Sequence, residues 1–373
     1  MPTAPSPETL THLVLAGGLL IGLGLGAVTQ LTRFCTMGAL ADLFSYGGVA
    51  RLLMWLLAVA VGTAGIQGLL AAGWLDGTRT LAWSPRLQWL SCAVGGGLFG
   101  FGMVLASGCP QRNLVRAGTG SLRAWVTLAT VALTAQMTLR GLLALPRTRW
   151  LDSQAIELAR PQDLGTLLAT VLPLSAPALR LVLCVLLLLA TAALLWRHRQ
   201  ALQPSQLAGG AAVGALLVAA LAVTGHVGYL AEHPETLEPA FLGTLSRRPE
   251  ALTFIAPMAG ALDLLTLWTD QSTRLSFGVS MALGVVLGGG LCAWRQGQWR
   301  LEGFADAADL RRHLGGAVLM GFGGVTALGC SIGQGVSGLA LQSAGAVLAV
   351  AGLVAGSWLA VRRQLQQADC AAG

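Results

Sequence analysis

The sequence predicts an all-α polytopic membrane protein, and three observations support that prediction. The chain is 54% hydrophobic and only 10% charged, with a mean hydropathy of +0.69, whereas soluble domains carry about 25% charged residues. Apolar runs of roughly spanning length recur, and a hydrocarbon core about 30 Å thick needs about 20 helical residues. The chain also has 50 glycines, and small residues let helices approach closely in a bilayer.

About nine apolar runs have the length of a membrane span. The first run follows a stretch without basic residues and shows no small-residue cleavage pattern, so it reads as a retained span rather than a signal peptide. One solitary run in the middle separates two groups of four and predicts a connector helix. The runs are 10–28, 50–74, 87–107, 124–145, 178–196, 207–230, 275–294, 314–328 and 344–361.

A repeated stretch divides the chain into two related halves. Residues 100–109 read GFGMVLASGC and residues 321–330 read GFGGVTALGC, so Gly, Phe, Gly, Val, Ala, Gly and Cys align without a gap. A fainter match places Thr32-Arg33-Phe34-Cys35 against Thr273-Arg274-Leu275-Ser276, which predicts a serine in the second half at the place of Cys35. We therefore expect a first repeat over 1–150, a loop and connector span over 151–206, and a second repeat with a tail over 207–373.

Short segments follow three of the spans. Residues 37–46, 110–123 and 331–341 are too short to cross and lie next to apolar runs. Non-helical backbone at membrane depth is tolerated only where protein or a cavity covers it. We expect re-entrant half-helices that meet near the middle of the membrane, within the inverted repeat typical of secondary transporters.

The arginines indicate the orientation in the membrane. All 23 basic residues are arginine, most lie between apolar runs, and arginine is enriched in cytoplasmic loops. The net charge of +7 therefore reads as a topology signal, which disfavours nucleic-acid binding. The C-terminus and the 295–312 loop then lie in the cytoplasm and the N-terminus outside, although Arg147, Arg149 and Arg160 fall outside against the rule.

The cysteines carry the candidate chemistry. The seven cysteines include no CxxC pair and no His/Cys cluster at metal spacing, and no Ser/His/Asp set stands out. Redox, zinc and hydrolytic readings therefore have little support, and we expect no metal, no cofactor and no enzymatic activity. Cys92, Cys184 and Cys292 lie inside apolar runs, where a free cysteine behaves as a small hydrophobic residue.

Cys35, Cys109 and Cys330 differ from the other cysteines, because each lies where a span gives way to a short segment. Gly108 and Gly329 directly precede two of them. A helix that starts at such a break presents unpaired N–H groups and a positive dipole end, and a thiol is a weak donor. The pattern suits a soft, sulfur-bearing anion, while simple helix kinks remain the structural alternative.

Three stretches resemble the signature segments of the YeeE/YedE family of sulfur-compound membrane transporters. They are GAVTQLTRFCTMGALAD, GGGLFGFGMVLASGCPQRNLVRAGTGS and LGGAVLMGFGGVTALGCSIGQG, and the resemblance extends over nearly the whole chain. It implies a multi-pass protein of the bacterial inner membrane that takes up thiosulfate through an hourglass-shaped helical fold.

The resemblance implies roles for particular residues. The functional cysteines of the family fall on Cys35, Cys109 and Cys330, and Ser331 and Gln334 are expected helpers. This chain departs from the family pattern in Pro110-Gln111-Arg112 after Cys109, and in glutamine rather than asparagine at Gln334. These departures affect the expected ligand preference more than the transport role.

The mechanism that we expect is a relay of the anion between thiols and backbone N–H groups. Arg33 and Arg116 either attract the anion at the cytoplasmic mouth or reach to the membrane interface as snorkelling residues. Two alternatives stay open: transport of another sulfur or selenium compound, and delivery of sulfur to a small cytoplasmic sulfurtransferase protein. The expected partners are thus a small sulfur anion and the lipid bilayer, with a small cytoplasmic sulfurtransferase protein as the partner in the delivery alternative. No nucleic acid is expected.

Overall fold

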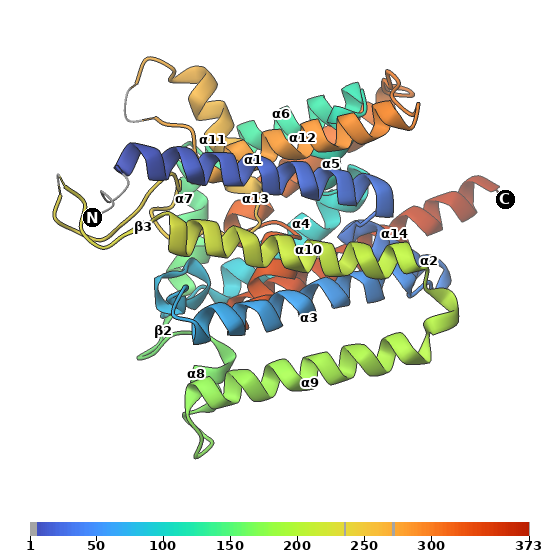
Figure 1. Cartoon of the computed structure of the whole chain (residues 1–373). Helices are drawn as coiled ribbons and strands as arrows, with labels where there is room; N and C mark the ends of the chain where they lie inside the picture. Colours follow the sequence, from blue (N-terminus) through green and yellow to red (C-terminus); the bar gives the residue numbers. More distant parts are fainter. Residues whose placement is uncertain (1–5, 235, 271–272, 373) are drawn as a thin grey trace.

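The structure, a computed structural model, describes residues 6–234, 236–270 and 273–372. Within this part of the chain nearly all of the regular structure is helical (Figure 1). The long helices are α1 (Pro7–Thr32), α3 (Ala50–Ala71), α4 (Trp89–Leu105), α6 (Leu122–Leu139), α9 (Ala176–Arg197), α10 (Pro204–Ala222), α12 (Phe277–Arg295), α13 (Ala307–Thr326) and α14 (Ala344–Ala372).

Shorter elements connect the long helices. Four of them follow breaks inside the bundle: α2 (Thr36–Tyr46), α5 (Pro110–Gly118), α11 (Ile255–Thr266) and the π-helical η7 (Gly333–Gly338). The others are α7 (Ala144–Pro146), α8 (Leu164–Leu168), η1 (Gly77–Arg79), η2 (Leu81–Trp83), η3 (Arg147–Leu151), η4 (Asp152–Gln154), η5 (Arg199–Ala201) and η6 (Val223–Val227). Strand β1 (Arg86–Leu87) pairs antiparallel with β2 (Ile156–Glu157), and β3 (Tyr229–Leu230) pairs antiparallel with β4 (Ala240–Phe241).

The helices confirm an all-α polytopic membrane protein. In the described residues, 7 helical segments are long and apolar enough to cross a membrane, and a bent pair formed by α6 and the following 144–154 segment raises the number to 8. Helix α13 has the length of a span, but its first turns carry Asp309, Arg311 and Arg312. The prediction of about nine spans thus depends on counting α13.

The two halves pack in matching pairs. Helix α1 packs on α12 and α10 packs on α3, while α4 packs on α14 and α13 packs on α6. Each pair combines one helix from either half of the chain. These are the partners that two interlocked repeats produce, and the two copies of the glycine-rich stretch, on α4 and α13, cross each other directly.

Glycine in the repeated stretch permits these close crossings. A Cβ at Gly100 would lie 2.1 Å from the carbonyl oxygen of Leu353 on α14, and one at Gly321 would lie 2.9 Å from the carbonyl oxygen of Val131 on α6. Any larger side chain would push the helices apart. Both copies of the motif therefore serve the same purpose in packing.

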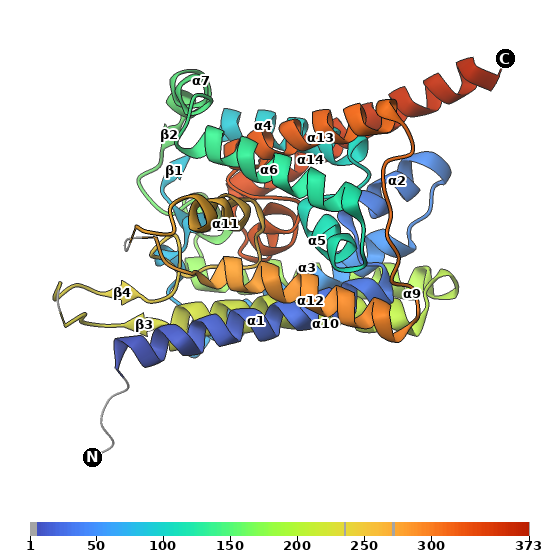
Figure 2. The same ribbon diagram turned by 90° about the horizontal axis from the view of Figure 1, so that it is seen from above.

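The short helices lie inside the bundle. Figure 2 shows α5 and α11 between a layer that contains α4, α6, α13 and α14 and a layer that contains α1, α3, α10 and α12. The connector α9 lies at the edge of the bundle against α3 (Figure 1). The start of α1 and the end of α14 lie at opposite ends of the helical bundle (Figure 1).

Candidate functional site

Cys35, Cys109 and Cys330 share one local backbone structure. The residue two positions before each cysteine is left-handed, with φ of 57° at Arg33, 52° at Ser107 and 60° at Leu328. Left-handed conformations are uncommon for residues other than glycine, and such strain gathers at functional sites. At each break the preceding helix ends, the chain turns sharply, and a short helix begins directly after the cysteine or within three residues of it.

The sulfur atoms of two of these cysteines accept backbone hydrogen bonds in the first turn that follows. The N–H of Gly38 donates to Cys35 Sγ at 3.3 Å, and the N–H of Gly333 donates to Cys330 Sγ at 3.3 Å. Cys35 is thereby the N-cap of α2, whereas the Cys330 sulfur accepts its bond in the turn that leads into η7. The thiols are thus built into the starts of the short segments, which fixes their positions.

The structure brings the three cysteines together in the bundle interior. Cys35 is 8% exposed, Cys109 0% and Cys330 1%. Cys35 and Cys330 are both electrostatic neighbours of the Cys109 thiol, and Ser331 lies beside it. The three sequence motifs therefore contribute to one buried cluster.

A fourth helix start faces this cluster, and the sequence motifs did not reveal it. The backbone of Phe254, the residue before α11, is an electrostatic neighbour of the Cys330 thiol. The expected correspondence of Ser276 with Cys35 is wrong, because Ser276 caps the long helix α12. In the second half the place of Cys35 falls to Phe254, whose apolar side chain and lack of a flanking glycine or cysteine offered no signal.

The glycines and amides around the cysteines shape the breaks. Gly108 and Gly329 turn the chain, with their N–H groups bonded back to Met103 and Gly324 at 2.9 and 2.8 Å. Four residues after Cys109 and four residues after Cys330, an amide side chain braces the turn. Asn113 Nδ2 donates to the Gly108 carbonyl at 3.1 Å, and Gln334 Nε2 donates to the Ala327 carbonyl at 2.6 Å. Asn113 is thus the structural counterpart of Gln334.

Two cavities adjoin the cysteine cluster. The larger cavity has a volume of about 250 Å³ and is lined by Gly329, Gly333 and Gln334. Residues of the loops at the N-terminal face, which is the end of the bundle where α1 begins, also line it. The smaller has a volume of about 80 Å³ and is lined by Thr36, Trp55 and Ser331 among others. The Ser331 hydroxyl is fully buried and has no hydrogen-bond partner among the described residues, so it is free to donate to a ligand.

Arg33 and Arg116 lie on the side of the cluster toward the end of the bundle at which α1 and α14 end. Arg33 is exposed at the end of α1. Arg116 on α5 donates from Nη1 to the Ser107 carbonyl at 2.7 Å and is an electrostatic neighbour of Cys35. Arg116 therefore braces the first glycine-cysteine break, while Arg33 is not part of the buried cluster.

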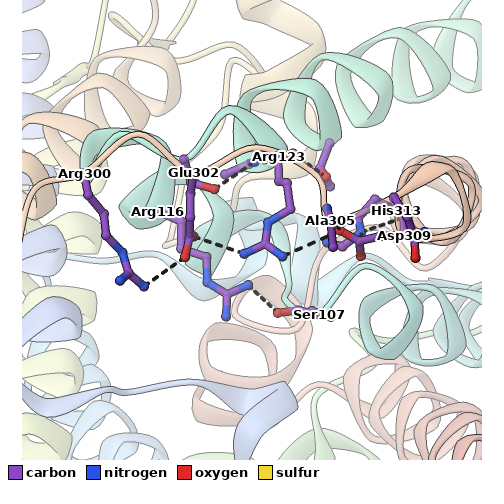
Figure 3. A network of polar contacts seen from close by, with 12 residues as sticks. Ser107, Arg116, Arg123, Arg300, Glu302, Ala305, Asp309 and His313 are labelled. Atoms are coloured by element: carbon purple, nitrogen blue, oxygen red, sulfur yellow. Dashed lines mark hydrogen bonds and ion pairs between the residues drawn. The ribbon is translucent and has the colours of Figure 1, made fainter.

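A polar network covers this side of α5 (Figure 3). Arg123 on α6 pairs with Glu302 at 3.1 Å and with Asp309 of α13 at 3.7 Å, and Arg300 also pairs with Glu302. The hydrogen bond from Arg123 holds the pKa of the Glu302 carboxyl below its ordinary value. The network ties the segment between α12 and α13 onto the start of α6.

Several helix starts surround the cysteine cluster, and this arrangement favours a small anion. In the described part of the chain, no group of three His, Cys, Asp or Glu side chains could hold a metal ion. Helices α2, α5 and α11 direct their positive N-terminal ends toward the thiols, and helix N-termini favour anions. Apolar spans around such an interior site define a membrane transporter rather than an enzyme.

The chain belongs to the sulphur transport family, whose profile matches residues 31–359. It is 28% identical to the thiosulfate transporter TsuA of Escherichia coli (strain K12), over 96% of this chain and 98% of the relative. It is 25% identical to the thiosulfate transporter TsuA of Spirochaeta thermophila, over 91% of this chain and 96% of the relative. A shorter match, 30% identical, covers 29% of this chain and 25% of the probable transporter YedE of Salmonella typhimurium.

Proposed function

We propose that this protein carries thiosulfate across the bacterial inner membrane, with the N-terminus in the periplasm and the C-terminus in the cytoplasm. The observation that carries the proposal is the convergence of three cysteine breaks on one buried cluster around Cys109. Two full-length relatives named thiosulfate transporters support the same substrate. The two repeats, 1–150 and 207–373, would each contribute half of the path.

The proposed path runs from the larger cavity, past Cys330 and Cys109, to Cys35. The larger cavity reaches the N-terminal face and borders the residues around Cys330. Burying a bare dianion is prohibitive without compensation, so the N-terminal ends of α2, α5 and α11 and the Ser331 hydroxyl must replace its water. Several weak sites in series suit conduction, because each one must also release the anion.

Uptake of labelled thiosulfate into vesicles that contain only this protein tests the proposal. We expect uptake that saturates with concentration and that competes with unlabelled thiosulfate more strongly than with sulfate. Absence of uptake in such vesicles, with recovery upon addition of a soluble sulfurtransferase protein, would instead support sulfur delivery. Stronger competition by selenite than by thiosulfate would shift the proposal to a selenium compound.

A further inference from the structure

The larger cavity contains one cationic side chain that is only partly used by the protein. Among the described residues that line this cavity, the charged ones are Arg147 and Glu250. Glu250 accepts two hydrogen bonds from Ser246, at 2.8 and 3.0 Å. Arg147 is paired only loosely, since its Nη1 lies 3.6 Å from Asp152.

The Arg147 guanidinium has a buried donor without an acceptor. Its Nε–H is enclosed and has no hydrogen-bond partner among the described residues, and the side chain is only 14% exposed. A buried donor left unpaired is unfavourable, most of all when it belongs to a charged group. Its ion-pair partner Asp152 faces the Arg147 Nη1 with Oδ2 and accepts a hydrogen bond from Ser91 on Oδ1 at 2.7 Å, so Asp152 leaves the Nε–H unpaired.

A second arginine in the same region shows what a fully satisfied guanidinium looks like here. Arg180 donates from Nε to Asp163 at 2.7 Å and from Nη2 to Thr166 at 2.9 Å, and it lies 4.0 Å above the ring of Trp83. Arg180 therefore serves the fold. Arg147 lacks such a set of partners, and the cavity that it lines leads to Gly329 and Gln334 on either side of Cys330.

We propose that Arg147 is the capture site for the transported anion in the larger cavity. Guanidinium presents its N–H groups in a planar fork that matches the oxygens of oxyanions. Arg147 would bind the sulfonate oxygens of thiosulfate before the anion reaches the Cys330 break. This inference rests on the proposed function and adds a binding residue that neither the cysteine motifs nor the arginine pattern indicated.

The first test compares the concentration dependence of thiosulfate uptake in four vesicle preparations. Arg147→Gln should raise KM about tenfold and leave the maximal rate near that of the unaltered protein. Arg149→Gln is the matched control, because Arg149 lies two residues away and is exposed; its KM should not change. Asp152→Asn removes the competing charge and should leave KM unchanged or lower.

Two results of this comparison would overturn the proposal. One is a KM for Arg147→Gln equal to that of the unaltered protein. The other is an equal rise in KM for Asp152→Asn and Arg147→Gln, because Arg147 would then act only through its ion pair. Absence of uptake by the unaltered protein would refute the proposed function and not the capture site, which the next measurement addresses directly.

A second measurement needs no variant and no transport. Phenylglyoxal modifies guanidinium groups, and mass spectrometry locates the modified residues. Thiosulfate should slow the modification of Arg147 at least severalfold and leave that of Arg149 unchanged. Equal modification of Arg147 with and without thiosulfate would overturn the proposal, even if Arg147→Gln failed to fold.

Discussion

Replacement of the central thiols by serine or alanine separates their chemistry from their part in the fold. The Cys330 sulfur accepts the Gly333 N–H at 3.3 Å and is 1% exposed. Leaving a buried N–H without its acceptor costs about 1–3 kcal/mol, so Cys330→Ala should destabilise the protein modestly without unfolding it. A hydroxyl is a better hydrogen-bond acceptor than a thiol, so Cys330→Ser should fold at least as well by this criterion.

Transport should respond very differently from stability. A hydroxyl is a stronger donor than a thiol and less suited to a soft anion, so it would alter both capture and release. We expect Cys330→Ser and Cys109→Ser to lower thiosulfate uptake at least tenfold, which corresponds to about 1.4 kcal/mol or more along the path. The assay is the initial rate of labelled thiosulfate uptake in vesicles, together with thermal unfolding in detergent.

Cys184 provides the matched control for the serine variants. It is buried at 3% exposure, but it lies on the peripheral connector α9. Cys184→Ser should therefore transport at the normal rate. The reasoning fails if both Cys109→Ser and Cys330→Ser take up thiosulfate at the normal rate, because the thiols would then be structural caps only.

Three further changes test the packing and the charged groups. Gly100→Ala should destabilise the protein by about 1–3 kcal/mol in thermal unfolding, because the added methyl group overpacks against Leu353. The control Gly68→Ala has open space around its Cβ and should be neutral or stabilising. Equal effects of the two substitutions on stability would contradict this packing argument. Burial raises the pKa of Glu250 despite hydrogen bonds from Ser246, so the larger cavity gains net positive charge as the pH falls through that raised pKa. The KM for thiosulfate should therefore fall as the pH falls, and Glu250→Gln should abolish this trend. If the trend persists in the variant, a group other than Glu250 causes it. The folded-state pKa of Glu302 is depressed, so its contribution to stability is present above its pKa in the unfolded chain and is lost as the pH falls through the folded value. Glu302→Gln should lack this acid-dependent loss, and identical acid unfolding of both proteins would refute the role of the network.

Parts of the cysteine site can be predicted from sequence because they depend on local chemistry. The repeated run that ends at Cys109 and Cys330 marks both breaks, since glycine and a change in polarity signal the end of an apolar helix. The position of Cys35 follows from the same change of polarity. Phe254 escapes this reasoning, because it is the backbone at the start of α11 that lies beside the Cys330 thiol, and the position of a backbone group leaves no trace in the residue type.

The sequence by itself determined the membrane class, the repeated glycine-rich stretch and the cysteine breaks, since hydropathy and glycine content act along the chain. Only the tertiary structure decided which breaks meet, which helix of one half packs on which helix of the other, and which guanidinium keeps an unpaired donor. In the sequence, Arg147 lies between apolar runs and Arg180 lies near the start of one, and neither position indicates which guanidinium the fold satisfies. They differ because Asp163 and Trp83 enclose one guanidinium, while the other lines an open cavity, and such surroundings arise only when distant segments pack together.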